Sequence, residues 1–344
     1  MTAFGTTRAP LMAGAVVVAC VLLVPLRAAA QVPADTAASS QKPLAVLERH
    51  RAGVTSVKFS PDARLLATAD LKGRIIVWRT GDWSELRTMQ HGAEVYAIAF
   101  SPDGKTLVSS GGDSTVSLWE AATGKRVRRL RYQRRSLAVA FASGGELLVG
   151  TEDGTVHFVD PSTGVERRKL DTNGSVWAVA VSSTSRTLAT GLPLRIWDYS
   201  TLTARAKPSA LAQLGLAFSG DGTLLASAES TGGALLWKVA DSISYVPLRL
   251  TTQKRANGPR GPETFSVNMP AASIDISRDG RRVVAGSTTS EIYVWNVAPA
   301  DTLAPTPTKL RGHTMTVSAI ALSPDGGLIA SGSLDRSVRV WRQP

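Results

Sequence analysis

The chain has 344 residues, a formal net charge of +12 and 43% hydrophobic residues, which is enough apolar material for a large core. Its single cysteine, Cys20, excludes both an internal disulfide framework and a zinc site built from cysteines. The strongly basic composition raises the question of an anionic partner and says nothing by itself about the fold.

Residues 1–30 predict an export signal. Arg8 supplies a positive start, residues 11–26 are a nearly continuous apolar run, and three alanines precede Gln31 as in a cleavage site. Two alternatives stay open. The apolar run is at the short end of what spans a bilayer as an uncleaved anchor, and Cys20 lies in a lipobox-like context, although apolar residues continue beyond it. We expect a periplasmic or secreted protein, or one anchored to the membrane by this segment.

Removal of the signal also removes Arg8, Cys20 and Arg27. The remaining chain then has no cysteine, and its net charge falls by two from +12 to +10. Residues 31–43 are rich in Ala, Ser and Pro without a strand pattern, so they predict a flexible tether.

From residue 44 onward the sequence repeats. The last unit, residues 310–341, has short apolar runs typical of strands, separated by the turn sequences SPDG and SLDRS. Corresponding units end at Trp78, Trp119, Val159, Trp197, Trp237, Trp295 and Trp341. Successive ends are 38 to 46 residues apart, except for one interval of 58. A unit of four short strands cannot bury both of its faces alone, so we expect it to stack on its copies.

These units resemble the WD40 repeat family, which has Gly-His near the start of each repeat, Trp-Asp near the end and a period of about 40–45 residues. The resemblance covers residues 44–341 and implies an all-β, seven-bladed propeller. It also implies that the strand at residues 44–48 pairs with the last blade and closes the ring, which removes exposed edges. We therefore expect one propeller domain over residues 44–344, with a long insert at 241–270 in place of an eighth blade.

The resemblance further implies a buried polar network in each blade, in which a His, a Ser or Thr, an Asp and the closing Trp satisfy one another. Two repeats contain all four residues: His313, Ser331, Asp335 and Trp341 in the last, and His91, Ser109, Asp113 and Trp119 in the second. The first repeat has His50, Thr68 and Trp78 but Lys72 at the Asp position, and the third keeps Asp153. The next three retain the closing Trp, with Ser227 in the fifth. The sequence thus predicts two complete networks.

No catalytic set stands out. Three of the four histidines occupy the structural Gly-His position, which leaves His157 on an expected strand. Several aspartates resemble calcium ligands in isolation, but each sits in an SPDG-type turn, where turn capping explains it: Asp62, Asp103, Asp221, Asp279 and Asp325. The sequence has no G-x-S-x-G elbow. We expect a non-enzyme without metal or cofactor. The alternative is a propeller enzyme or small-ligand binder that uses the central channel.

Three features are candidates for partner binding. The basic run at residues 125–135 should form an outer strand over 126–131, followed by Tyr132, Arg134 and Arg135, which we interpret as a patch for an anionic partner. Residues 253–262 in the insert read as a basic, strandless and mobile loop; its cations are Lys254, Arg255 and Arg260. Tyr96 and Trp177 begin equivalent inner strands, where they either fill the core or act as binding anchors.

The sequence therefore predicts a protein-interaction scaffold, expected to be a monomer, that presents a rigid propeller face to a protein partner. It leaves the identity of that partner open. Export argues against nucleic acid despite the positive charge. The remaining alternative partner is an anionic polymer of the cell envelope, bound through the basic patch.

Overall fold

The computed structural model describes residues 41–344 apart from 183, 185, 208–212, 231–232, 240–242, 259–260 and 299–305. Only the backbone is described for residues 252–258 and 261–268. The predicted export signal with Cys20, and the tether up to residue 40, lie outside the described residues. In the described part of the chain all regular elements are strands, and no helix there could cross a membrane.

The strands are short, and most alternate or run continuously in apolar residues. Blades 1 to 3 comprise β2 (Val54–Phe59), β3 (Leu65–Asp70), β4 (Arg74–Arg79), β5 (Glu85–Gln90), β6 (Val95–Phe100), β7 (Thr106–Gly111), β8 (Thr115–Glu120), β9 (Arg126–Arg131), β10 (Ser136–Phe141), β11 (Leu147–Thr151), β12 (Thr155–Val159) and β13 (Glu166–Asp171). Blades 4 and 5 comprise β14 (Val179–Val181), β15 (Thr187–Thr190), β16 (Arg195–Asp198), β17 (Ala204–Ala206), β18 (Gln213–Phe218), β19 (Leu224–Glu229), β20 (Gly233–Val239) and β21 (Ile243–Leu248). Blades 6 and 7 comprise β24 (Ala271–Ile276), β25 (Arg282–Ser287), β26 (Ile292–Asn296), β27 (Thr308–Leu310), β28 (Ala319–Leu322), β29 (Leu328–Gly332), β30 (Val338–Arg342) and β1 (Ala45–Leu47).

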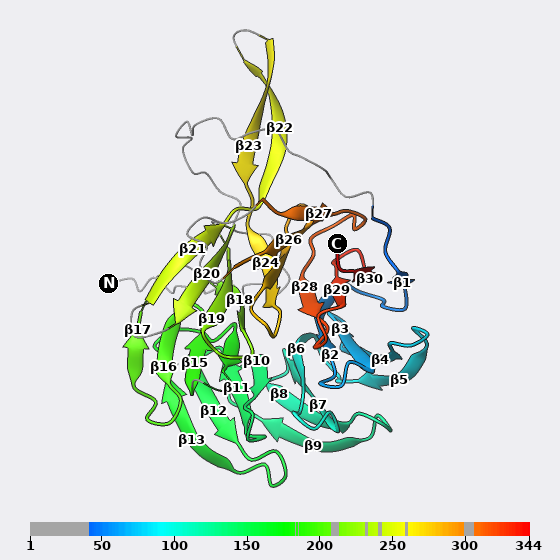
Figure 1. The fold of residues 1–344 in the computed structure, drawn as a ribbon. Coiled ribbons are helices and arrows are strands. Elements are labelled where there is room, and N and C mark those ends of the chain that lie inside the picture. The colour runs from blue at the N-terminus through cyan, green and yellow to red at the C-terminus, as the bar shows by residue number, and fades with distance from the viewer. Residues whose placement is uncertain are drawn as a thin grey trace, which may run out of the picture. The chain divides into compact units, whose positions relative to one another are not determined.

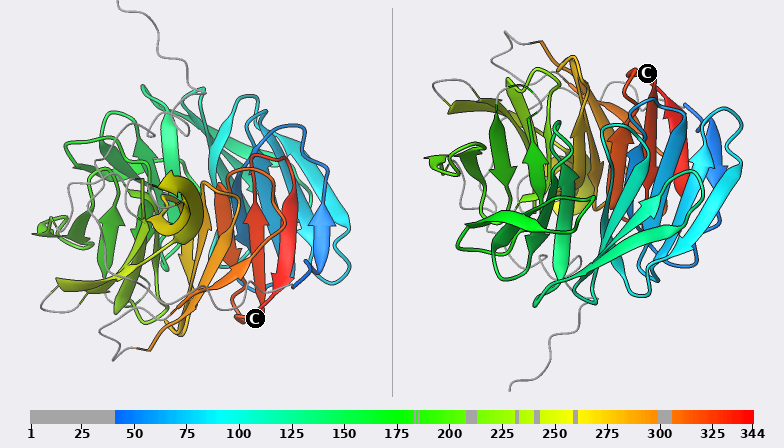
Figure 2. Two further views of the ribbon diagram at one scale, coloured as in Figure 1. Left: turned by 90° about the horizontal axis from the view of Figure 1, so that it is seen from above. Right: turned by 90° about the horizontal axis from the view of Figure 1, so that it is seen from below.

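These strands form seven four-stranded antiparallel sheets arranged as the blades of a ring (Figure 1). Seen from the side, the strands stand upright and the connecting loops gather at their two ends (Figure 2). The first strand of each blade is innermost and contacts the first strand of the next, including β28 against β2. The prediction of a seven-bladed propeller is confirmed.

Strand β1 closes the ring. It pairs antiparallel with β30, with Ala45 opposite Val340 and Leu47 opposite Val338. The Leu44 N–H also donates to the Val340 carbonyl at 2.6 Å. The expected closure by residues 44–48 is therefore confirmed, and blade 7 has no unpaired outer edge at β30.

The core is divided among the seven interfaces between neighbouring blades. Each interface holds one cluster of buried apolar side chains. In six blades the closing Trp packs into the interface with the preceding blade, as Trp78 does with Val340 of blade 7. Blade 3 has the much smaller Val159 at this position, in the interface with blade 2.

The insert is not the strandless loop that its composition suggested. Strands β22 (Thr251–Gly258) and β23 (Gly261–Asn268) pair as a hairpin, which Figure 1 shows as a separate ribbon outside the four-stranded sheets. Gly258 pairs with Gly261 at its end, so the Gly and Pro residues are confined to the tip. β-branched residues on both arms, and Phe265 on β23, favour pairing.

The SPDG-type turns join the inner two strands of five blades. In each, the Ser hydroxyl and the N–H two residues after the Asp donate to the same carboxylate oxygen, as for Ser60, Asp62 and Arg64 at 2.6 and 3.1 Å. The same pattern holds at Asp103, Asp221, Asp279 and Asp325. These carboxylates serve their own turns, as the sequence predicted.

Candidate functional site

One end of the propeller carries the loops that lead from the outer strand of a blade to the inner strand of the next, together with the turns between second and third strands. Hydrogen bonds join the two sets of loops. His313, from the loop before β28, bonds Asp335, from the turn before β30, at 2.9 Å. The Gly112 N–H donates to the Glu94 carbonyl at 2.9 Å in the same way. We call this end the upper face.

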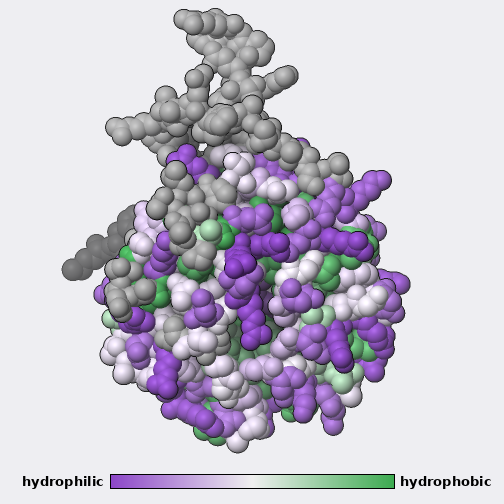
Figure 3. Space-filling view, in the orientation of Figure 1, coloured by the Kyte–Doolittle hydropathy of each residue, from purple (hydrophilic) through white to green (hydrophobic). Residues whose placement is uncertain are grey.

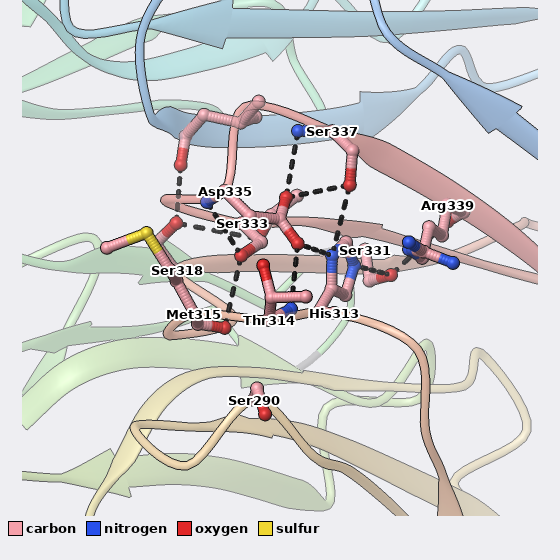
Figure 4. Close-up of polar contacts among 12 residues, drawn as sticks. Ser290, His313, Thr314, Met315, Ser318, Ser331, Ser333, Asp335, Ser337 and Arg339 are labelled. Carbon is pink, nitrogen blue, oxygen red and sulfur yellow. Dashed lines mark hydrogen bonds and ion pairs between the residues drawn. The ribbon is translucent and has the colours of Figure 1, made fainter.

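Blade 7 contains a complete buried network (Figure 4). His313 Nδ1 lies 2.9 Å from Asp335 Oδ2, and its Nε2 lies 2.8 Å from Ser331 Oγ. Trp341 donates its indole N–H to Ser331 at 2.9 Å, and the Ser337 hydroxyl contacts both Asp335 and His313. Every polar atom of the imidazole is therefore satisfied in the interior.

The ionisation of this network follows from burial and hydrogen bonding. Burial lowers the pKa of His313, against the opposing effect of Asp335, and so favours the neutral imidazole. Burial alone would raise the pKa of Asp335, but hydrogen bonds from Ser337, the Thr314 N–H and His313 outweigh it and lower that pKa to about 2. At neutral pH the network holds one carboxylate and one neutral imidazole.

Blade 2 assembles the same four residue types. His91 lies 2.8 Å from Ser109 Oγ, and Trp119 donates to that oxygen at 2.9 Å. Asp113 is more distant from the imidazole, at 3.4 Å, and forms an ion pair with Arg129 of β9. The outer strand of this blade is thus tied to its buried network.

Blade 1 also has a complete network, so the prediction of only two was wrong. His50 Nδ1 lies 2.9 Å from Asp70 Oδ2, its Nε2 lies 2.8 Å from Thr68 Oγ1, and Trp78 donates to Thr68 at 2.9 Å. Asp70 ends β3 two residues before Lys72, where the Asp was expected. Residues 68 and 70 point to the same side of the strand because side chains alternate, so the carboxylate reaches the imidazole from there.

Blades 4 and 5 keep a reduced version without the histidine. Trp197 donates to Thr190 at 3.0 Å, and Trp237 donates to Ser227 at 2.8 Å. The Thr190 contact was missed in the sequence because the shorter turn of blade 4 places the hydroxyl seven residues before the Trp, compared with ten in blade 5.

Blade 3 departs furthest from this pattern. Tyr132 occupies the histidine position, since its N–H donates to Ser114 O just as the His91 N–H donates to Gly73 O. Its ring packs against His157, with 4.7 Å between centroids. His157 in turn contacts Glu166 at 2.5 Å and Thr151 at 3.4 Å. The spare histidine of the sequence is therefore part of a substitute arrangement.

The structure divides the predicted basic patch into two parts. Arg134 lies exposed beside Tyr132, in a groove between blades 2 and 3. Arg135 faces elsewhere and forms a two-pronged ion pair with Glu152, at 3.0 and 2.5 Å, which raises the pKa of its guanidinium. Its positive charge is therefore offset within the chain.

Arg135 belongs instead to a cluster that includes both predicted aromatic anchors. The Tyr96 hydroxyl lies near the Arg135 guanidinium and also raises the pKa of that group. Ser175, two residues before Trp177, donates to the Glu152 carbonyl at 2.6 Å. Tyr96 and Trp177 are both partly exposed. We call these residues, Tyr96, Arg135, Glu152 and Trp177, the blade 2–4 cluster of the upper face.

The remaining predicted cations are in the insert. Lys254 and Arg255 lie on β22, of which the structure describes only the backbone, and Arg260 lies outside the described residues. The base of the hairpin is attached to blade 6, because the Tyr293 hydroxyl and the Lys309 ammonium both donate to the Thr251 carbonyl, at 3.0 and 2.7 Å.

The inner strands around the channel carry one charged pair of note. Asp275 accepts hydrogen bonds from the N–H groups of Ile276 and Leu322, at 2.9 and 2.8 Å. Burial raises its pKa, against the attraction of Lys58 on β2. Since the Leu322 bond joins blades 6 and 7, we read Asp275 as a strut between blades. Among the described residues, no cluster of three His, Cys, Asp or Glu has the geometry to hold a metal ion.

Figure 3 shows one face of the ring as mainly hydrophilic, with small, separate apolar areas where the structure describes it. Such a face suits binding that combines a few apolar anchors with polar contacts.

Two family models match parts of the chain. The one described as "WD domain, G-beta repeat" matches residues 305–342, and the "Anaphase-promoting complex subunit 4 WD40 domain" matches residues 57–143. These matches support the WD40 resemblance in the first blades and the last.

Curated relatives are similar over short stretches. A periodic tryptophan protein 2 homolog of Neurospora crassa is 38% identical over 81 residues, which are 23% of this chain and 8% of that protein. Guanine nucleotide-binding protein subunit beta-5b of Danio rerio is 38% identical over 76 residues, 22% of this chain and 18% of that protein. Small ribosomal subunit protein RACK1y of Oryza sativa subsp. japonica is 41% identical over 59 residues, 17% and 16% of the two chains. The matches thus span less than a fifth of each relative, and these organisms are eukaryotic.

Proposed function

We propose that this chain, a seven-bladed propeller whose repeats resemble the WD40 family, is a non-enzymatic docking platform that binds a protein partner through the blade 2–4 cluster of its upper face. The single observation behind the proposal is that two hydrogen bonds fix Arg135 to Glu152 at the upper face, with the partly exposed Tyr96 near Arg135. The partly exposed Trp177 lies two residues after Ser175, which donates to the Glu152 carbonyl.

The chemistry of the cluster suits protein recognition. Tyr, Trp and Arg are the residues that most often dominate the energy of binding at protein interfaces. Arg135 is fixed by two bonds to Glu152, so less side-chain entropy is lost when a partner contacts it. Tyr96 stands on the inner strand β6, and Trp177 lies two residues before the inner strand β14. A rigid scaffold of inner strands therefore positions both aromatic residues.

The names of the relatives support a platform rather than an enzyme. One is a subunit of a guanine nucleotide-binding protein, and another is a protein of the small ribosomal subunit. Both names describe components of larger assemblies. The partner of the present chain is a separate question, because the similarity covers one or two repeats.

We also propose that the platform acts outside the cytoplasm. The support is the sequence of residues 1–30, with its positive start, apolar run and small residues before Gln31. N-terminal sequencing of the protein from a fractionated host tests this. A mature chain that begins at Gln31 in the envelope or culture fluid supports cleavage and export. An intact chain in the membrane indicates an anchor, and an intact chain in the cytosol contradicts the proposal.

Affinity capture tests the docking function. The tagged protein is incubated with envelope extract at low and high salt, beside a Tyr96→Ala/Trp177→Ala variant and an Arg87→Gln control on the outer strand of blade 1. We expect one or a few proteins to be retained at both salt concentrations by the wild type and the control, and to be lost with the double variant. Equal retention by all three proteins contradicts the proposed surface, and material that is lost in salt contradicts a specific protein partner.

A further inference from the structure

A groove of about 660 Å³ runs between blades 2 and 3. One wall is the end of β9 and the loop after it, with Leu130 to Arg134. The other wall is formed by β12 and β13. Its volume is in the range of sites that bind small molecules or side chains of a partner.

The groove has a cause in the sequence. In the other six blades a Trp fills the interface with the preceding blade, but here the position is Val159. The hydroxyl that accepts from the Trp in blade 2, Ser109, is replaced by Val149, its equivalent in strand pairing. Tyr132 and His157 pack against each other with tilted rings, and both line the groove. We therefore attribute the groove to the small side chains at these two positions.

Three cations that line the groove have no ion-pair partner within 4 Å among the described residues. They are Arg131, Arg134 and Lys169. Most neighbouring arginines have partners within the chain. Arg129 pairs with Asp113, Arg167 with Asp160 and Arg168 with Glu146, and Arg135, in the loop after β9, pairs with Glu152. On β9, Arg128 donates to the Ser162 carbonyl and Arg126 lies over the Trp119 ring. If these edge charges only prevented aggregation, paired and unpaired cations would serve equally well. Three unpaired cations converging on one groove indicate an anionic ligand.

Two carboxylates in the same groove restrict what that ligand can be. Glu166 is bound to His157. Burial alone would raise the pKa of Asp153, but bonds from Thr151 and Thr155 outweigh it and lower that pKa, so this carboxylate is charged at neutral pH. A uniform polyanion that follows the groove would meet both negative charges. A peptide can place carboxylates at the cations and an uncharged side chain next to Asp153 and Glu166.

We infer that the groove binds a short acidic peptide segment in which an aromatic side chain is flanked by carboxylates. The carboxylates pair with Arg131, Arg134 and Lys169, and the aromatic ring packs on Tyr132 in the space that Val159 leaves. The inference rests on the proposed docking function in one respect, that the segment belongs to a protein partner. It adds a second contact surface, at the outer side of blades 2 and 3.

Fluorescence anisotropy with synthetic peptides tests the inference on the purified protein. The probe is a labelled peptide with one Phe between runs of Glu and Asp. The controls are the same peptide with Gln and Asn in place of the acids, an all-Glu peptide and a heparin oligosaccharide. We expect the Phe-containing acidic peptide to bind most tightly. Equal or tighter binding of heparin, or no binding of the probe, overturns the inference.

Variants locate the binding. Arg131→Gln/Arg134→Gln/Lys169→Gln should weaken the probe about tenfold or more, since each exposed pair contributes up to about 1 kcal/mol. Arg87→Gln on β5 is the control for an exposed arginine outside the groove and should leave affinity unchanged. Val159→Trp fills the groove without a change of charge and should also abolish binding, with near-ultraviolet circular dichroism as the check on folding. Unchanged affinity in both groove variants overturns the inference.

The same variants separate this inference from the proposed function. In one outcome a partner is captured through Tyr96 and Trp177, also by the triple groove variant, and no peptide binds. The docking function then stands and the groove inference is overturned. In the other outcome a peptide binds through the groove but no partner is captured through Tyr96 and Trp177. The groove inference then stands and the proposed docking surface is overturned.

Discussion

Blades 7, 1 and 2 differ from blade 3 in how their interiors are satisfied. The three blades at and beside the ring closure each join a histidine, a hydroxyl, a carboxylate and a Trp in one buried network. Blade 3 has Tyr132, Val149 and Val159 at three of these positions and a groove beside them. Buried hydrogen bonds fix the blade geometry most strongly where the two ends of the propeller meet. Blade 3, beside the groove, has fewer of these bonds.

One equivalent position on the inner strands also differs in role from blade to blade. Ser318 of blade 7 donates to Val54 O of blade 1, and Thr55 of blade 1 donates to Val95 O of blade 2 at 2.6 Å. These hydroxyls connect consecutive blades across the closure. The equivalent residues in blades 2 and 4 are Tyr96 and Trp177, which are partly exposed at the upper face. The same position thus connects consecutive blades at Ser318 and Thr55 and offers aromatic surface at Tyr96 and Trp177.

The largest expected difference in stability comes from truncating the closing residue of blade 7 and that of blade 3. Trp341→Ala should lower the free energy of unfolding by about 3–5 kcal/mol, because it empties a fully buried volume and leaves Ser331 without its indole donor. Val159→Ala should cost only about 1–2 kcal/mol. Chemical denaturation measures both values. Equal losses would show that blade 3 is as tightly specified as blade 7.

The next test concerns the two histidines. His313→Ala should cost about 1–3 kcal/mol, because Asp335 and Ser331 lose a buried partner. His157→Ala should cost less than about 1 kcal/mol, since its partner Glu166 is exposed. Differential scanning calorimetry compares the two melting temperatures. A shift below about 1 °C for His313→Ala would contradict a network that stabilises the closure.

The repeat period and the turn residues made the fold predictable from sequence. Turn residues such as Asp325 and closing residues such as Trp341 act through local geometry, which a fixed spacing records directly. The closure by residues 44–48 came from the resemblance to known propellers, and the pairing of Ala45 with Val340 confirms it. The sequence did not predict contacts whose residues change position between repeats.

Asp70 and Thr190 illustrate this limit. Each supplies its group from a position displaced from the one in the reference repeat, and only the direction of the side chain shows that it reaches the same partner. The pairing of Arg135 with Glu152 joins two loops of neighbouring blades, so no local pattern predicts it. The groove depends on the volume that the small Val159 side chain leaves empty. The absence of a Trp at that position was visible in the sequence.

A smaller effect separates Asp70 from Lys72 in blade 1. Asp70→Asn keeps the shape but removes the charge that the His50 bond and two backbone N–H groups stabilise, and should cost about 1 kcal/mol. Lys72→Asn changes an exposed side chain and should be neutral within about 0.5 kcal/mol. Urea denaturation distinguishes them. Similar losses in both variants would mean that the carboxylate of blade 1 does not contribute to the network.

The smallest expected effect is a dependence of stability on pH that comes from the buried histidines of blades 2 and 7. Burial lowers the pKa of His91 and of His313 in the folded protein, so the unfolded chain takes up protons first as the pH falls through about 6.5. The free energy of unfolding therefore decreases below that pH. Asp335, with a pKa of about 2, adds its own loss only as the pH falls below its ordinary value of 3.8. Between pH 7.5 and 5.5 the melting temperature should drop by about 1–3 °C. The drop should be smaller in His91→Gln/His313→Gln and unchanged in His157→Gln. A drop that is instead abolished by His157→Gln would assign the pH dependence to blade 3 and reverse the comparison.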